Sequence, residues 1–225
     1  TMHKLTLYLL IFFSSNILSA QDVWGGISVA TPDNLNAISG NPAGLGISRG
    51  TQFGIYIPFD SVFTMHRSVR FNKFGFDLKY KFSDGKFPNI FNPSDANFGF
   101  GVQVSPNTYA GFKWNKENFV DLGLLYRPIN QLSIGSVIRY NDAFTTYDQT
   151  TIGIAIRPFL NHRLTVGADW TYLNNDKVEN DYSILSPHLT LELFDGILLS
   201  TRTNNDHDLQ INLAFNFGRH TMYSP

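Results

Sequence analysis

Cysteine is absent from all 225 residues, which excludes a disulfide framework, a thiol nucleophile and a thiolate metal site. Charged residues make up only 16% of the chain, below the roughly 25% that is typical of a soluble domain. The net charge of −1 provides no basic field for nucleic acid. After residue 20 no apolar run approaches the ~20 residues of a spanning helix, so this part of the chain could cross a membrane only with strands.

Aromatic residues, in contrast, are abundant. They reach 15% of the chain, with 20 Phe and 10 Tyr. Many aromatic side chains and little charge favour a surface that partly faces something other than water. A β-sandwich with a large aromatic core explains the same composition, so both interpretations stay open here.

The N-terminus has the features of a secretory signal peptide. Met2-His3-Lys4 is a short positive start, residues 5–18 are mostly apolar, and Leu18-Ser19-Ala20 offers a small-residue cleavage site. We expect residues 1–20 to be this signal and the mature chain to begin near Gln21. The alternative is a signal anchor that stays attached.

From about residue 50 onward, every second residue is apolar in a series of short segments, which is the period of a β-strand with two unlike faces. The pattern predicts an all-β fold, an antiparallel up-and-down transmembrane β-barrel of about 12 strands within a range of roughly 8–14. We expect one domain, with a hatch-like segment at residues 21–50, the barrel at 51–217 and a tail at 218–225. The predicted strands cover residues 51–59, 61–70, 74–82, 97–105, 108–114, 118–127, 131–140, 148–157, 163–173, 183–194, 196–203 and 208–217.

The connections between these strands alternate in length, as the periplasmic turns and outer loops of bacterial barrels do. Residues 106–107, 127–131, 157–162 and 195–196 are short links, whereas 83–96, 141–147 and 174–182 are longer. A weak repeat has the same period: Tyr126-Arg127-Pro128 and Ile156-Arg157-Pro158 each precede a turn and another strand. Proline marks a strand end because it cannot donate to the ladder.

One face of the predicted strands is apolar and the other carries glycine and charge. Phe76, Leu78 and Tyr80 are expected to face lipid, and Tyr or Trp near strand ends suits the headgroup level. Glycine on the polar face would relieve crowding and permit bending inside a curved barrel. The residues expected to line the lumen are Asp77, Lys79, Lys81, Gln103, Asp121, Arg139, Asp169, Glu192 and Arg202.

A motif lies between the signal and the first strand: Asn41, Pro42, Ala43, Gly44 and Leu45, preceded by Asn36-Ala37-Ile38-Ser39-Gly40. In this position it resembles the N-terminal motif of the long-chain fatty-acid transporter family of outer-membrane barrels and of the related type IX secretion shuttle barrels. The resemblance implies a hatch inside or beneath a shortened barrel, and no substrate is carried over from it. A plain turn before the first strand is the alternative.

Little in the sequence points to catalysis or to a cofactor. The histidines are scattered without the spacing of a metal pair, and neither a Gly-x-Ser-x-Gly elbow nor a phosphate-binding loop occurs. The best catalytic candidate, Asp206-His207-Asp208, lies in an expected outer loop and is better explained as a solvated turn. We therefore expect no enzyme, no cofactor and no metal site.

These observations predict a porin-like β-barrel in the outer membrane of a Gram-negative bacterium. Its expected partners are outer-membrane lipid and a small amphipathic solute that it binds or passes, and not nucleic acid. The first alternative is a structural or accessory membrane anchor with a plugged lumen, associated with an envelope protein partner such as a secretion component or a protease. A barrel-wall enzyme and a secreted soluble sandwich are further alternatives.

Overall fold

A computed structural model describes residues 28–33, 35–48, 50–56, 64–81, 93–141, 144, 146–159, 163–174, 182–194, 197–204 and 209–215. The signal peptide, the C-terminal tail and Asp206-His207-Asp208 lie outside these residues. A short α-helix and a 3₁₀-helix precede the strands: α2 (Asn36–Ser39) and η1 (Pro42–Gly46). The strands are β1 (Thr51–Tyr56), β2 (Thr64–Phe71), β3 (Phe74–Lys81), β4 (Asp95–Ser105), β5 (Thr108–Asn115), β6 (Val120–Ile129), β7 (Leu132–Asn141), β8 (Thr146–Ile156), β9 (Leu164–Leu173), β10 (Tyr182–Phe194), β11 (Ile197–Thr203) and β12 (Leu209–Phe215).

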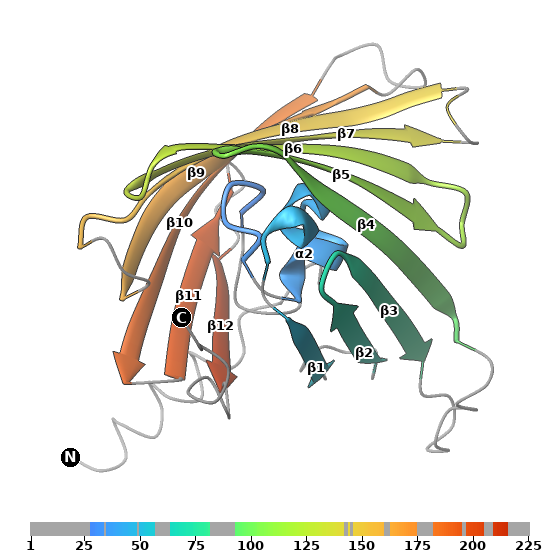
Figure 1. Ribbon diagram of the computed structural model, residues 1–225, viewed down its shortest axis with the longest axis horizontal. Coiled ribbons are helices and arrows are strands. Elements are labelled where there is room, and N and C mark those ends of the chain that lie inside the picture. The colour runs from blue at the N-terminus through green and yellow to red at the C-terminus, as the bar shows by residue number, and fades with distance from the viewer. Residues whose placement is uncertain are drawn as a thin grey trace.

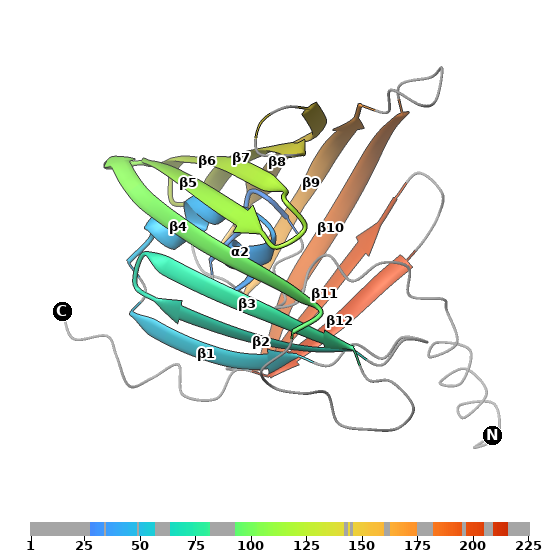
Figure 2. The same cartoon turned by 90° about the vertical axis from the view of Figure 1, so that its right-hand side faces the viewer.

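The twelve strands form one sheet in sequence order, and each pairs antiparallel with the next. The prediction of an all-β, up-and-down chain is therefore confirmed. The sheet curls around α2 (Figure 1), and a second view shows its two edge strands, β1 and β12, on the same side of the molecule (Figure 2). Among the described residues no pairing joins β12 to β1, so closure into a barrel stays a prediction.

The strand bounds follow the alternation closely, with one instructive difference at Pro128. We expected the strand to end at Arg127, but β6 continues to Ile129. The register between β6 and β7 shifts between Tyr126 and Ile129, and this irregularity accommodates a residue that cannot donate to the ladder. The matching Pro158 behaves as predicted, since β8 ends at Ile156.

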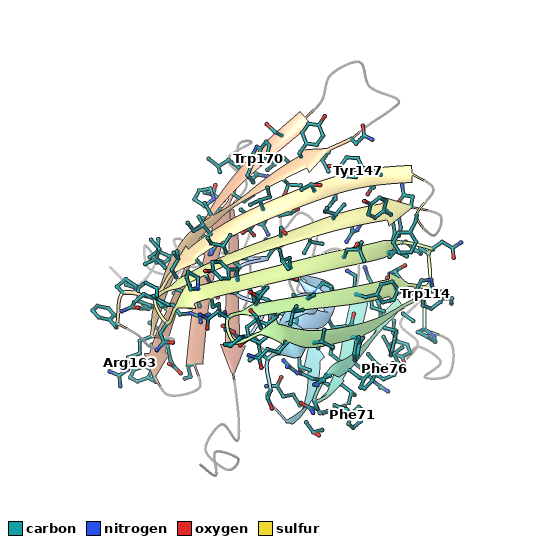
Figure 3. The ribbon with its side chains drawn as sticks, turned by 45° about the horizontal axis from the view of Figure 1, so that its top comes forward. Phe71, Phe76, Trp114, Tyr147, Arg163 and Trp170 are labelled. Atoms are coloured by element: carbon teal, nitrogen blue, oxygen red, sulfur yellow. The ribbon has the colours of Figure 1, made fainter. Side chains whose placement is uncertain are left out.

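The two faces of the sheet have opposite chemistry, and the polar face is the buried one. Leu124, Ile154 and Trp170 are 49%, 47% and 45% exposed, whereas Asp121 and Asp169 are 0% and 1% exposed. Seen from its outer side, the sheet presents Phe76, Trp114 and Trp170 on its surface (Figure 3). This distribution is the reverse of a water-soluble sheet, which buries its apolar face.

One predicted outward residue departs from this distribution. Tyr80 lies on the same face of β3 as Phe76, but it is only 1% exposed, and the guanidinium of Arg67 lies 5.3 Å from the centre of its ring. The outward side predicted for Tyr80 is therefore kept, but its side chain is covered there and is not open to the surroundings. Among the described residues, no helix is both long and apolar enough to cross a membrane.

Candidate functional site

The first described residues of the chain lie on the concave, polar face of the sheet, and we call residues 28–47 the inner segment. It contains α2 and η1, and η1 contacts β4, β5 and β6 (Figure 1). Its apolar side chains form a small buried cluster of Leu35, Ala37, Ile38 and Leu45. Several of its polar groups contact polar groups of the sheet, so the segment and the inner face share a polar interface.

The Asn-Pro-Ala-Gly-Leu motif forms η1, and Asn41 anchors it. The Asn41 Oδ1 accepts a hydrogen bond from the Ala43 amide at 3.0 Å, which caps the 3₁₀-helix, and Pro42 occupies the first helical position. The Asn41 Nδ2 donates to the carbonyls of Val29 at 2.7 Å and Leu124 at 3.1 Å. Asn41 is 0% exposed, so one buried side chain joins the helix, the preceding segment and strand β6.

Glycines on the inner face make room for this helix. Gly101, Gly111 and Gly123 lie directly opposite one another across β4, β5 and β6. A Cβ on Gly111 would overlap the backbone of Pro42, and one on Gly123 would overlap the Asn41 Oδ1. The glycines of the polar face therefore permit close backbone approach by the inner segment. The sequence predicts that glycines on this face relieve crowding. The structure shows that, at these positions, the backbone and side chains of the inner segment lie where a Cβ would be.

Arg70 holds the C-terminal end of η1. Its Nη2 donates to the carbonyls of Gly44 and Leu45, each at 3.2 Å, and to that of Ile47. The last carbonyls of a helix lack intrahelical partners, and a buried guanidinium satisfies several of them at once. Arg70 is 0% exposed, and it lies one residue before the end of β2.

Two arginines of the sheet converge on Asp33 of the inner segment. Arg127 Nη2 lies 2.5 Å from Oδ1, and Arg157 Nη2 is paired with Oδ2. Arg127 also donates from Nε to Ser133 Oγ at 3.2 Å, and that hydroxyl donates to the carbonyl of Ala30 at 2.5 Å. The two arginines are those of the Arg-Pro repeat, so the repeat places two equivalent cations beside one carboxylate.

Asp169 makes the reciprocal contact from strand β9. Its Oδ1 accepts from the Ser28 hydroxyl at 2.6 Å, and its Oδ2 accepts from the Val29 amide at 3.2 Å. With Asp33 this fixes both ends of residues 28–33, which we call the arm. The arm crosses the inner face of β7 and β8, where a Cβ on Gly135 would overlap the backbone of Val29.

Two rows of polar side chains cross the strands beside the inner segment. In the first, Asp121 pairs with Lys113 on one neighbouring strand and with Arg139 on the other, and the Arg139 Nε to Asp121 Oδ1 distance is 2.8 Å. Lys113 also donates to the carbonyl of Ser39 at 3.0 Å. The second row links Ser68, Asp77, Asn97 and Asn115 through hydrogen bonds of 2.5, 3.3 and 2.8 Å.

The predicted lining residues are distributed over this face as follows. Asp77, Asp121 and Asp169 are buried, Lys79, Arg139, Glu192 and Arg202 are partly exposed, and Gln103 is exposed beside a turn, where it donates to the Pro106 carbonyl at 2.9 Å. The side chain of Lys81 lies outside the described residues. Whether these residues line an open lumen stays a prediction.

Several interface residues were not predicted from the sequence, namely Asp33, Arg70, Lys113, Arg127 and Arg157. The Arg-Pro repeat is the available signal for two of them, but from the sequence it indicates only a strand end and a repeating hairpin unit. Among the described residues no group of three His, Asp or Glu side chains is placed to hold a metal ion.

Substituting Gly111 tests the close approach of η1. We expect Gly111→Ala to lower the free energy of unfolding by about 1–3 kcal/mol, because the new methyl group meets backbone that cannot move aside. Gly99→Ala is the matched control, since its Cβ meets chiefly the end of the flexible Leu45 side chain at 2.8 Å. Urea unfolding followed by tryptophan fluorescence measures both, and equal losses in the two variants would contradict the explanation.

Asn41→Asp tests the two donations from Asn41. The carboxylate keeps the acceptor for Ala43 but leaves the carbonyls of Val29 and Leu124 without their donor, so we expect a loss of about 1–3 kcal/mol in the same assay. Asn130→Asp, in the exposed turn between β6 and β7, should be neutral. A neutral effect at Asn41 would mean that this anchor contributes nothing to stability.

No protein-family model matches the chain, and no curated protein sequence is significantly similar to it. The resemblance to the fatty-acid transporter and secretion shuttle barrels therefore depends on the motif at Asn41–Leu45 and its position alone.

Proposed function

We propose that the protein is an outer-membrane β-barrel whose lumen is plugged by the inner segment, and that it serves as an accessory membrane anchor instead of an open pore. The observation that carries the membrane part is the inverted sheet. Leucine, isoleucine, phenylalanine and tryptophan side chains cover its outer face, while aspartate, lysine and arginine are buried inside. Continuous apolar patches of this extent on a protein surface indicate contact with lipid or with another protein.

The arrangement of the connections supports a fixed orientation in the membrane. The turns that join β2 to β3, β4 to β5 and β6 to β7 each span two residues, at 72–73, 106–107 and 130–131, and all lie at one end of the sheet, which we call the short-turn end. Bacterial barrels place such turns in the periplasm. Unpaired sheet edges are not tolerated in lipid, so the proposal includes pairing of β12 with β1.

The contacts of the inner segment support a plug. Asn41, Arg70, Lys113, Asp169 and the Asp33 ion pairs hold it to strands β2, β5, β6, β8 and β9 through buried polar groups. Removing such a segment would take from these buried groups the partners that it supplies, which is costly in a low-dielectric interior. A segment held in this way closes the lumen and stiffens the wall, and both effects suit an anchor for an envelope protein.

Binding or passage of a small amphipathic solute is the second candidate function. The observation that favours it is the excess of positive charge where Arg127 and Arg157 share the single carboxylate of Asp33. Movement of the arm would expose both cations on the inner face. In this case the segment would act as a gate and not as a fixed plug.

Ile154→Arg tests the membrane proposal. Ile154 is on the outer face of β8, and a cation there should destabilise the membrane-inserted protein by about 2–4 kcal/mol if it meets the hydrocarbon. The same substitution at Asn130, in a turn, is the matched control and should have little effect. Refolding into lipid vesicles with a heat-modifiable gel shift is the readout. Stable solubility without detergent, together with equal behaviour of both variants, would contradict membrane insertion.

Single-channel recording in planar bilayers tests the plug. We expect no steady current from the wild-type protein, and intermittent current from Asn41→Asp, because its anchor to β6 is weakened. Asn130→Asp should remain silent. A large steady current through the wild-type protein would show that the lumen is open and would favour the transport function.

A further inference from the structure

Arg127 and Arg157 are two cations that the sheet itself places beside Asp33 of the inner segment. Arg127 belongs to β6 and Arg157 follows β8 directly, and each is the arginine of an Arg-Pro pair at the short-turn end. Each guanidinium takes a different oxygen of the same Asp33 carboxylate. Arginine pairs of this kind are the usual means of recognising a planar carboxylate.

The ion pairs at this site leave an excess of positive charge. Two guanidiniums meet one carboxylate, and the side chains of Arg127, Arg157 and Asp33 are only 18%, 10% and 7% exposed. In addition, the buried Nε of Arg157 has no hydrogen-bond partner among the residues that the structure describes. A buried, unused donor on a cation is costly unless another acceptor can reach it. The site therefore has capacity for more acceptor atoms than Asp33 fills.

We propose that Arg127 and Arg157 form a binding site for the carboxylate of a small solute, and that Asp33 occupies this site as an internal substitute for the ligand. The carboxylate of the solute displaces Asp33, pairs with both guanidiniums and accepts from the Nε of Arg157. Because Asp33 ends the arm, displacement frees that end and leaves the arm held only through residues 28–30, by Asp169, Asn41 and Ser133, while α2 and η1 remain held by Arg70 and Asn41.

The inference goes beyond the anchoring role, and it is testable whether or not the protein inserts into a membrane. The site uses only protein groups at the strand ends, so binding can be measured in detergent. A failure to bind would leave the inverted sheet and the heat-modifiable shift untouched. Conversely, a failure of membrane insertion would leave the carboxylate site to be judged by binding alone.

The first experiment measures binding of acetate and benzoate by calorimetry to the wild-type protein and to Asp33→Ala and Asp33→Asn. Removing the internal carboxylate should tighten binding at least about tenfold, because the site no longer has to be vacated first. Benzamide, the neutral analogue of benzoate, should not bind. If benzoate binds more tightly than acetate, the ligand is amphipathic. If the two bind equally, the site takes a small free anion.

Adding Arg157→Ala to Asp33→Asn should abolish the gain, because it removes one of the two cations together with the Nε donor that the ligand would use. Arg139→Ala on the same background is the control for loss of a buried cation elsewhere on the inner face, and it should retain binding. Folded Asp33→Asn protein that binds neither anion more tightly than wild type would overturn the proposal. Equal loss of binding with Arg139→Ala would do so too.

The second experiment follows the arm directly and uses the absence of native cysteine. A single cysteine at Ala30, which is 0% exposed, should react slowly with a maleimide and several-fold faster in benzoate. A cysteine at Ala43 in η1, which is equally buried, should keep its rate. A rate at Ala30 that does not change in benzoate, or that changes equally at both positions, would contradict displacement of Asp33.

Discussion

The rest of the structure depends on the satisfaction of polar groups on the buried face of the sheet. Charged and amide side chains point inward, where water cannot hydrogen-bond to each of them. A buried ion without a partner is strongly destabilising. Some of these polar groups pair with side chains on neighbouring strands. Asp121, for example, forms ion pairs with both Lys113 and Arg139. Others bind the inner segment, which brings backbone carbonyls to Arg70 and Lys113 and one carboxylate to Arg127 and Arg157.

This view explains why the inner segment is so poor in regular structure. Its backbone carbonyls and amides bind side chains of the sheet. Short helical turns leave more of these groups without intrahelical partners than a long helix would. Arg70 donates to three backbone carbonyls of this segment, and Asn41 donates to two carbonyls from different parts of the chain. Glycines in the wall complete the fit because only a bare backbone lets η1 approach this closely.

Much of the fold could be predicted from the sequence, because the alternation of apolar and polar residues is a local signal. The strand around residues 120–129 is recognisable from Leu122 and Leu124 on one face and Asp121 and Gly123 on the other. The motif at Asn41–Leu45 was also recognisable. The partners of the arm could not be predicted: Asp33 meets Arg127 and Arg157 at separations of 94 and 124 residues, and no local pattern encodes such pairings. The burial of Tyr80 was missed for a similar reason, since strand parity alone does not show what covers a side chain.

The contact between Ser28 and Asp169 spans 141 residues, and this separation has a consequence for assembly. The arm reaches this site only when β9 is part of the sheet, whatever the order in which the strands form. A contact between residues so far apart in the sequence closes a long loop. The chain loses conformational entropy in closing it before the contact stabilises the fold, and folding is slower as a result. The inner segment therefore cannot take up its place at Asp169 before the strands that hold it have paired.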